Sequence, residues 1–272
     1  APLTFADAYF SQLLTGICDS LTSQAAGMML WLGNRTKEET LDNILAMGML
    51  DGVIVTADTI DDPLVDGLRA SDLPSVLVGH RRADRDASYV DVDHEAAAEA
   101  ITAHLVNTGR KEIYHITGRP NSVSGRDRAI GFRSALRRAG LPHEGHVVPG
   151  DYTDESGYEA TKNLLASGVS VDGLFCGNDN TARGAYRALF EAGMSIPDDV
   201  ARDGLFFGFF SDGGATGEKY TREAFGEIEL PLRVPLAAGK EHCTTKKVKV
   251  DCLRRLCRLG IRLLSAALNS RR

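Results

Sequence analysis

The chain has 272 residues, of which 43% are hydrophobic and 25% charged, and this ordinary composition excludes a disordered chain, a collagen-like fibre and a disulfide-dense mini-protein. Its formal charge of −6 argues against a protein that grips nucleic acid over its whole surface. No apolar run approaches the roughly 18 residues that span a bilayer, and the first residues do not resemble a signal peptide. The five cysteines are odd in number and lack C-x-x-C spacing, which favours a reducing compartment. We therefore expect a cytoplasmic protein with no membrane partner.

Short β-rich runs alternate with helical stretches from the start of the chain to about residue 210. Most of these runs are continuously apolar, as expected for strands that are covered on both faces. They predict strands at Met28–Leu32, Gly52–Thr56, Ser75–Val78, Tyr89–Val92, Glu112–Thr117, His146–Val148, Gly173–Cys176 and Leu205–Phe209.

The stretches between these runs space their apolar residues three or four apart, which is the period of an amphipathic helix. They predict helices at Ala8–Thr22, Glu95–Asn107, Arg126–Ala139 and Asp179–Ala192. The alternation predicts an α/β protein built from βαβ units, with parallel sheets and right-handed crossovers. Ligands of such sheets bind beyond the carboxyl ends of the strands, so the residues that follow strands are the first candidates for a site.

Phosphate-loop and zinc motifs fail on their spacing. The glycine-rich run at 212–217 lacks the G-x-G-x-x-G pattern and has Glu218 where a phosphate loop needs lysine. His94 has no second histidine at helical spacing for zinc, and it is expected to be an exposed residue near a helix start. No metal and no cofactor are therefore expected.

Motifs of nucleophilic and acid–base catalysis are equally incomplete. Ser122 and Ser124 have no identifiable base, and the segment around them lacks the first glycine of a nucleophile elbow. The paired carboxylates Asp61 and Asp62 lie among turn residues, where aspartate normally caps a helix. We expect no catalytic residues, and the protein is predicted not to be an enzyme.

Four segments carry groups that suit a small polyhydroxylated ligand. Tyr9 and Phe10 open the first helix, and an aromatic face can cover the C–H side of a sugar ring. Asp93 follows a strand and can accept two hydroxyl hydrogen bonds, although capping of the next helix is the alternative. After another strand comes Asn178, the expected ligand contact, beside Asp179, the expected helix cap.

The fourth segment is the polar loop at 118–128, which follows the strand Glu112–Thr117 and enters a helix. Arg126 and Arg128 stand near the start of that helix, where the helix dipole makes basic residues unfavourable. Their placement points to another purpose, such as a planar fork that holds vicinal hydroxyls or a carboxylate.

Six ordered segments of this chain resemble the ligand-sensing core of lac-repressor/galactose-repressor (LacI/GalR) transcriptional regulators. The resemblance covers roughly residues 5–200. The segments are Asp51-Gly52-Val53-Ile54-Val55, Val92-Asp93-His94-Glu95-Ala96, Thr108-Gly109-Arg110-Lys111-Glu112-Ile113, Arg128-Ala129-Ile130-Gly131-Phe132 with Ala135-Leu136, Asn178-Asp179 with Ala182-Arg183-Gly184-Ala185, and Ile196-Pro197-Asp198-Asp199-Val200.

The resemblance implies a type I periplasmic-binding-protein fold, with two doubly wound parallel-sheet subdomains joined by crossover strands. It implies an N-terminal subdomain at 1–116, a C-terminal subdomain at 117–204, a return to the first at 205–243 and a return to the second at 244–272. The family's effector contacts fall on Tyr9, Phe10, Asp93, Ser122, Ser124, Arg128, Tyr152, Asn178 and, at the end of a late strand, Asp212.

The function implied by the resemblance is that of a sugar-sensing core which controls operator binding allosterically. Family members bind operator DNA as homodimers through an N-terminal helix-turn-helix, which we expect to be missing from these residues. The alternatives are a secreted sugar-binding transport protein of the same fold and, on the fold alone, an enzyme.

The charge is divided unevenly, since residues 240–272 carry +8 and the rest of the chain −14. The basic tail is expected to be a solvated helix face, with nonspecific phosphate contact as the alternative.

Overall fold

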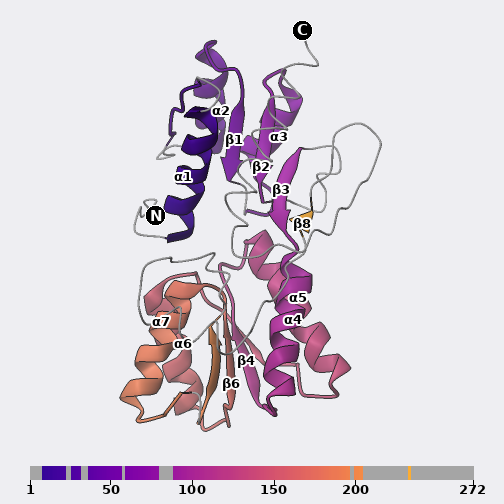
Figure 1. Ribbon diagram of the computed structural model, residues 1–272, viewed down its shortest axis with the longest axis vertical. Helices are drawn as coiled ribbons and strands as arrows, with labels where there is room; N and C mark the ends of the chain where they lie inside the picture. The colour runs from indigo at the N-terminus through magenta and orange to yellow at the C-terminus, as the bar shows by residue number, and fades with distance from the viewer. Residues whose placement is uncertain are drawn as a thin grey trace. The chain divides into compact units, whose positions relative to one another are not determined.

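The computed structural model describes residues 8–22, 26–31, 36–56, 59–79, 88–196, 199–204 and 232–233. These residues divide into two units (Figure 1). The first holds the described residues up to Val92 together with β8 (Leu232–Arg233), and the second runs from Asp93 through β7 (Ala201–Gly204).

The division falls earlier than the boundary expected after residue 116. Strand β4 (Ile113–Ile116) pairs with two strands that follow it in the chain, and its backbone hydrogen bonds therefore place it in the second unit. Strand β8 lies within the range 205–243 and pairs with β3 (Tyr89–Val92) of the first unit. The rest of that range and the whole of 244–272 lie outside the described residues, so their predicted places stay predictions.

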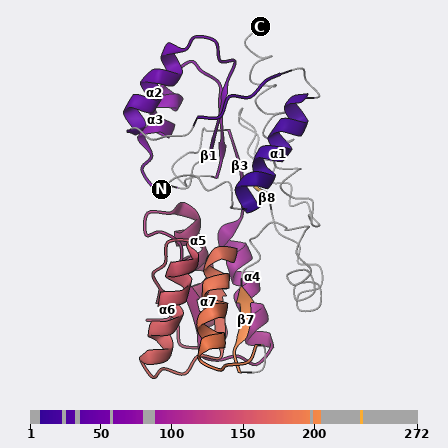
Figure 2. The same cartoon turned by 90° about the vertical axis from the view of Figure 1, so that its left-hand side faces the viewer.

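The first unit contains a four-stranded sheet in the order β1-β2-β3-β8. Strands β1 (Val53–Thr56), β2 (Ser75–Val78) and β3 are parallel, and β8 runs antiparallel to β3. Helices α2 (Lys37–Ala46) and α3 (Pro63–Ala70) lie on one side of the sheet and α1 (Ala8–Thr22) on the other (Figure 2). The core under α2 and α3 is formed by Ile44, Val55, Leu64, Val65, Leu68 and Leu77.

Helices α2 and α3 each begin at a side-chain cap. The Thr36 hydroxyl accepts the Glu39 amide at 3.2 Å while the Glu39 carboxylate accepts the Thr36 amide at 3.3 Å, a reciprocal capping box. Asp62 accepts the Leu64 amide at 3.0 Å at the start of α3, and Pro63 fills the first helical position. The capping role expected for the Asp61-Asp62 pair is thus confirmed at Asp62.

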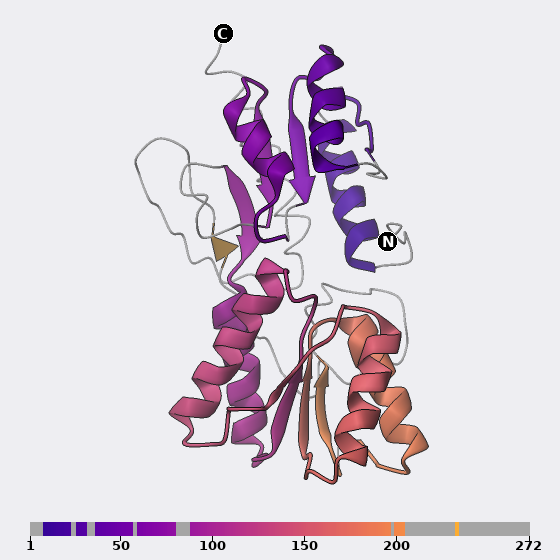
Figure 3. The same cartoon turned by 180° about the vertical axis from the view of Figure 1, so that it is seen from behind.

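The second unit has an all-parallel sheet in the order β5-β4-β6-β7, which adds β5 (Val147–Val148) and β6 (Gly173–Cys176) to β4 and β7. Helices α4 (His94–Asn107) and α5 (Val123–Arg138) cover one face of this sheet. Helices α6 (Asp154–Ala166) and α7 (Asp179–Glu191) cover the other (Figures 1 and 3).

Alternating side chains of the central strands supply the two cores of this unit. Tyr114 and Ile116 of β4 pack with Leu189 and other residues from α6 and α7. His115, one residue along, points to the opposite face, where its ring lies 5.4 Å from that of Phe132 in α5. Because helices cover both faces of the sheet, every residue of β4 is buried. This explains why the strand lacks the alternation of apolar and exposed polar residues.

The order of the strands creates a switch point between β4 and β6. From β4 the chain passes to β5 on one side, then crosses back to β6 on the other side of β4. The helices that follow β4 and β6, namely α5 and α7, therefore leave toward opposite faces of the sheet. A crevice outside the carboxyl ends of the strands is the usual ligand site at such a point.

Most predicted elements are confirmed with bounds that shift by a few residues at most. The strand predicted at Met28–Leu32 is wrong for its described part, because residues 28–31 pair with no described strand. The side chains of those four residues are 37–55% exposed, and strand propensity alone does not produce a strand without a partner. The strand predicted at Leu205–Phe209 lies outside the described residues.

Helices α2, α3 and α6 form where no helix is predicted from the apolar spacing of the sequence. N-cap residues Thr36, Asp62 and Thr153 stand at the starts of these helices. For these three helices the polar cap is a better indicator of where the helix begins than the spacing of apolar residues. None of the described helices is long and apolar enough to cross a membrane.

Candidate functional site

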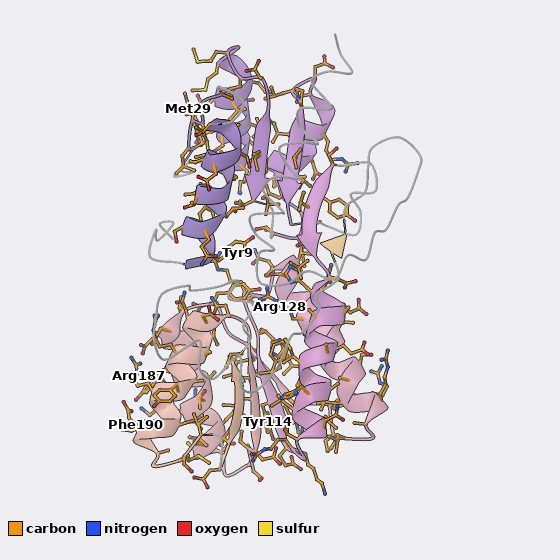
Figure 4. All side chains as sticks on the ribbon, in the orientation of Figure 1. Tyr9, Met29, Tyr114, Arg128, Arg187 and Phe190 are labelled. Atoms are coloured by element: carbon orange, nitrogen blue, oxygen red, sulfur yellow. The ribbon has the colours of Figure 1, made fainter. Side chains whose placement is uncertain are left out.

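Arg128 lies on the second turn of α5, and its side chain is buried although it carries a charge. One guanidinium nitrogen, Nη1, donates to the carbonyl of Gly177, which directly follows β6. The other, Nη2, lies 3.4 Å from Nδ1 of His94, the first residue of α4. Arg128 therefore links the end of a central strand to the start of a neighbouring helix, at one end of the second unit (Figure 4).

A cluster of hydroxyl groups lies beside this arginine. The Tyr152 hydroxyl is 2.8 Å from Oγ of Ser122 and 2.9 Å from Oγ of Ser124. Ser122 also caps α5, where its Oγ accepts the Gly125 amide at 2.9 Å. The centre of the Tyr152 ring lies 5.9 Å from the guanidinium carbon of Arg128, within the range of a cation–π interaction. The loop after β4 and the segment before α6 thus meet at the same place.

Two glycines make room for Tyr152. A Cβ on Gly118 would overlap the Tyr152 ring, and a Cβ on Gly125 would come within 3.1 Å of its hydroxyl oxygen. Tyr152 itself has a φ of 72°, a left-handed conformation that costs a residue with a side chain some free energy. The tyrosine is held in this backbone conformation by the contacts of its ring and hydroxyl.

Asn178 joins the same cluster through both ends of its amide. Its Oδ1 accepts the Thr181 amide at 2.9 Å and the Thr181 hydroxyl at 2.7 Å, so Asn178 is the N-cap of α7. Its Nδ2 donates to the backbone carbonyl of Tyr152 at 2.9 Å. The expectation that Asp179 caps the helix is wrong, because Asn178 is the cap, while the ligand contact expected of Asn178 stays a prediction. The Asn178 amide has both an acceptor oxygen and a donor nitrogen, so it can cap the helix through one and bond to a neighbouring loop through the other.

Asp93 takes the alternative role that the sequence left open. Its Oδ1 accepts the Ala96 amide at 3.1 Å, which makes Asp93 the N-cap of α4. It stands one residue before His94 and therefore close along the chain to the Arg128 contact.

The structure brings together five of the nine expected ligand residues by direct hydrogen bonds or ring contacts. These are Ser122, Ser124, Arg128, Tyr152 and Asn178. Asp93 belongs to the same unit. Tyr9 and Phe10 lie on α1 of the first unit, with their rings edge-to-face at 6.4 Å. Asp212 lies outside the described residues.

Three participants were missed in the sequence. His94 and Gly177 contact Arg128, and Gly118 accommodates the Tyr152 ring. The position of Gly118 and Gly177, each soon after a central strand, is the signal that could have identified them. His94 was assigned only an exposed position at a helix start, and its contact with Arg128 depends on how α4 packs against α5.

Strand β4, which precedes the loop with Ser122 and Ser124, carries a buried histidine, His115. The pKa of His115 is lowered to about 3, chiefly because the ring is buried; the hydrogen bond to the Phe175 carbonyl raises it, and the positive charges of Arg128 and Arg133 lower it. Its Nδ1 is 2.9 Å from the Phe175 carbonyl, which can only accept, so Nδ1 carries the proton. His115 is therefore neutral near pH 7 and adds no positive charge beside Arg128.

The chemistry of the cluster is that of hydrogen bonding. A guanidinium, an amide, three hydroxyls and a carboxylate can orient a polar molecule by its hydroxyls or its charge. No group of three or more metal-ligating side chains gathers within the part of the chain that the structure describes.

A doubly wound unit with polar side chains collected at its switch point is typical of domains that bind small molecules. Comparison with known proteins assigns the family. The chain belongs to the family described as periplasmic binding proteins and sugar binding domain of LacI family, whose model matches residues 4–211. The α/β fold with parallel sheets, expected from the sequence, is confirmed.

The relatives in this family are transcriptional regulators. The chain is 32% identical over 201 residues to the HTH-type transcriptional regulator CelR of Thermobifida fusca, covering 72% of this chain and 59% of that protein. It is 26% identical over 233 residues to the ribose operon repressor of Escherichia coli K12, covering 83% and 71%. These relatives are regulators and repressors rather than enzymes, in agreement with the sequence expectation.

A solved structure extends the likeness to the fold. The complex of the transcriptional regulator CelR with cellobiose has a TM-score of 0.77 at 26% identity, with 98% of this chain and 75% of that chain covered. The chain spans 59% of the length of CelR and of the catabolite control protein A of Priestia megaterium.

Proposed function

We propose that this chain is the effector-binding core of a LacI-type transcriptional regulator, and that its effector is a sugar or a sugar derivative. The observation that carries the proposal is Arg128, a buried charge whose guanidinium is held by the Gly177 carbonyl and His94 at the switch point of the sheet. A charge is costly to bury, and a buried, oriented guanidinium beside the carboxyl ends of the strands is well suited to hold vicinal hydroxyls or a carboxylate.

The other candidate residues supply the remaining contacts in this proposal. Asn178 and Asp93 offer an amide and a carboxylate, while the Ser122, Ser124 and Tyr152 hydroxyls line the loop side. Tyr9 and Phe10 supply aromatic faces for the C–H side of a ring, and Asp212 supplies a further carboxylate. A sugar is supported by the family description and by the neighbouring CelR–cellobiose complex.

The regulatory part of the proposal is that effector binding changes the affinity for operator DNA. A ligand can shift such an equilibrium only by its differential affinity for the two states of the protein. The DNA contact would be made by an N-terminal helix-turn-helix encoded upstream of these residues, and the protein would act as a repressor or activator in the cytoplasm. Support comes from the relatives, which are named as regulators and repressors.

We also propose that the regulator is a homodimer, with the outer face of α7 in the interface. Tyr186 and Phe190 are 47% and 70% exposed on this helix, and their rings stack with centroids 6.4 Å apart. Figure 4 shows Phe190 and Arg187 on the outside of the second unit. Arg187 of α7 lies 3.3 Å from Glu155 and 3.5 Å from Asp154, both on α6, so charges of both signs lie beside the two rings and a second copy of this surface can meet them with opposite charges.

The test of effector binding is a thermal-shift screen of the chain against neutral sugars, including cellobiose and ribose, and against nucleosides, followed by titration calorimetry. We expect a sugar to raise the melting temperature and Arg128→Ala to abolish the rise. Arg137→Ala, an exposed arginine on the last turn of the same helix, is the matched control and should leave the rise unchanged. Equal stabilisation of the Arg128→Ala protein would refute the assigned site.

The regulatory and oligomeric parts have separate tests. An upstream reading frame that encodes a helix-turn-helix supports a regulator, whereas a signal peptide there would contradict it. Sedimentation velocity should give a dimer that Phe190→Ser dissociates, while Val169→Ser, at a 41% exposed residue outside the helices, should not. A wild-type monomer at micromolar concentration would exclude the dimer.

A further inference from the structure

The guanidinium nitrogens of Arg128 contact two groups from different elements, one from the backbone and one from a side chain. The Gly177 carbonyl belongs to the backbone after β6 and cannot be changed by substitution. The other group is the imidazole of His94, with Nδ1 at 3.4 Å from Nη2 of Arg128. Both groups lie in the second unit, so the arrangement is internal to that unit.

The direction of the hydrogen bond follows from chemistry. A guanidinium has five N–H donors and no acceptor, so His94 must accept through Nδ1. This hydrogen bond requires a ring with no proton on Nδ1. A ring in that form fixes one edge of the guanidinium plane, while the Gly177 carbonyl fixes another.

The close packing of α4 on α5 brings His94 to Arg128. A Cβ on Gly131, three residues after Arg128, would overlap the carbonyl oxygen of Glu95, the residue after His94. The first turn of α4 therefore rests directly on the α5 backbone, and the Asp93 cap holds that turn in place. His94 has a structural reason to be where it is, independent of any ligand.

We propose that His94 is a positioning residue for Arg128, and that it sets the orientation in which the guanidinium meets the effector. The proposal rests on the proposed function in that the effector contact is made by Arg128. Without an acceptor at residue 94 the guanidinium loses the contact at Nη2, and the side chain samples rotamers that do not present the fork to a ligand.

The first experiment needs no ligand. In the full chain, the ¹⁵N signals of the Arg128 Nη atoms, assigned by their loss in Arg128→Lys, should be resolved because rotation about the Nε–Cζ bond is hindered. We expect His94→Leu to merge these signals. His94→Asn places Oδ1 where Nδ1 stands and should keep them resolved. His143→Leu, in the loop after α5, is the matched control and should match the wild type.

The second experiment measures affinity for the sugar found in the screen, with cellobiose as the first probe. His94→Leu should weaken binding about tenfold and His94→Asn should restore it to within about threefold, as expected for one hydrogen bond to a charged group. The melting temperatures of the free variants should stay within a few degrees of one another, which separates positioning from loss of fold.

The outcomes separate the two proposals. Resolved Arg128 signals and unchanged affinity in His94→Leu would overturn the positioning role even if Arg128 binds the sugar. The proposed effector is refuted if the wild type binds no sugar. In that case the orienting contact still stands if the Arg128 Nη signals merge in His94→Leu and stay resolved in His94→Asn. Failure of His94→Asn to rescue either readout would contradict the hydrogen bond as the cause.

Discussion

The ring of Tyr152 lies over Gly118 at a distance that leaves no room for a Cβ on the glycine. Gly118 follows β4, whereas Tyr152 stands between β5 and α6, so the contact ties the loops after two neighbouring strands together. The Tyr152 hydroxyl continues the tie to Ser122 and Ser124 at the start of α5. The candidate site therefore depends on Gly118 because this residue has no side chain and leaves space for the Tyr152 ring.

Gly118→Ala should displace Tyr152 and destabilise the chain by about 1–3 kcal/mol, the usual range for an inserted methyl in a packed place. Urea unfolding measures the change in the free energy of unfolding. In a Tyr152→Ala background the added methyl meets no ring, so the same substitution should cost much less. Equal costs in the two backgrounds would show that the ring is not what excludes the methyl.

Asn178 can be divided into its two roles by substitution. Asn178→Ala should cost about 1 kcal/mol as a lost N-cap, while Asn178→Asp keeps an oxygen for the Thr181 amide and should retain most of that stability. Both variants lose the Nδ2 donor to the Tyr152 carbonyl and should weaken effector binding. Chemical denaturation measures the free energy of unfolding, and calorimetry measures the affinity for the effector. If Asn178→Asp keeps both its stability and its full affinity, the hydrogen bond to the Tyr152 carbonyl does not matter for binding.

His115 makes stability depend on pH in a definite direction. Burial lowers its pKa in the folded chain to about 3, while the unfolded chain keeps an ordinary histidine, so the unfolded state binds the proton first as the pH falls. The contribution of neutral, buried His115 to the free energy of unfolding is fully present above about pH 6.5 and is lost as the pH falls toward 3. Between pH 6.5 and 4.5 the loss should be on the order of 2 kcal/mol, at roughly 1.4 kcal/mol per pH unit.

The variant His115→Asn isolates this effect, because an amide can still donate to the Phe175 carbonyl but does not titrate in this range. Its free energy of unfolding should fall less between pH 6.5 and 4.5 than that of the wild type. The lowered pKa values of Asp151 and Asp199, caused by hydrogen bonds from Thr153 and Ser195, act at lower pH and stay in both proteins. Parallel pH profiles would contradict the assignment.

Gly184 controls the spacing of α6 and α7. A Cβ there would overlap the carbonyl oxygen of Asp154, a backbone atom that cannot turn aside. Gly184→Ala should therefore destabilise the chain by about 1–3 kcal/mol. Gly27→Ala is the control, since nothing lies within 4 Å of an added Cβ there, and its effect should stay within about 0.5 kcal/mol. A Gly184→Ala protein as stable as this control would mean that the helices can separate at little cost.

The sequence was sufficient for the elements with strong local signals. The helix Ala8–Thr22 and the strands Ser75–Val78, Tyr89–Val92 and Gly173–Cys176 have the predicted bounds, because apolar period and turn residues are encoded locally. It was insufficient at Met28–Leu32, where an apolar run predicted a strand whose described residues have no partner. Pairing is a property of two segments, and one segment does not reveal the other.

Length, composition and charge excluded several classes of protein, the alternation of strands and helices predicted the α/β fold, and six ordered segments indicated the family. The residues after the strands also indicated the parts of the candidate site, because parallel strands place their carboxyl ends at one edge. The tertiary structure decided the rest. It selected Asn178 as the α7 cap and brought His94 to Arg128 through the packing of α4 on α5. These choices depend on distances between segments far apart in the chain, which no local pattern of residues contains.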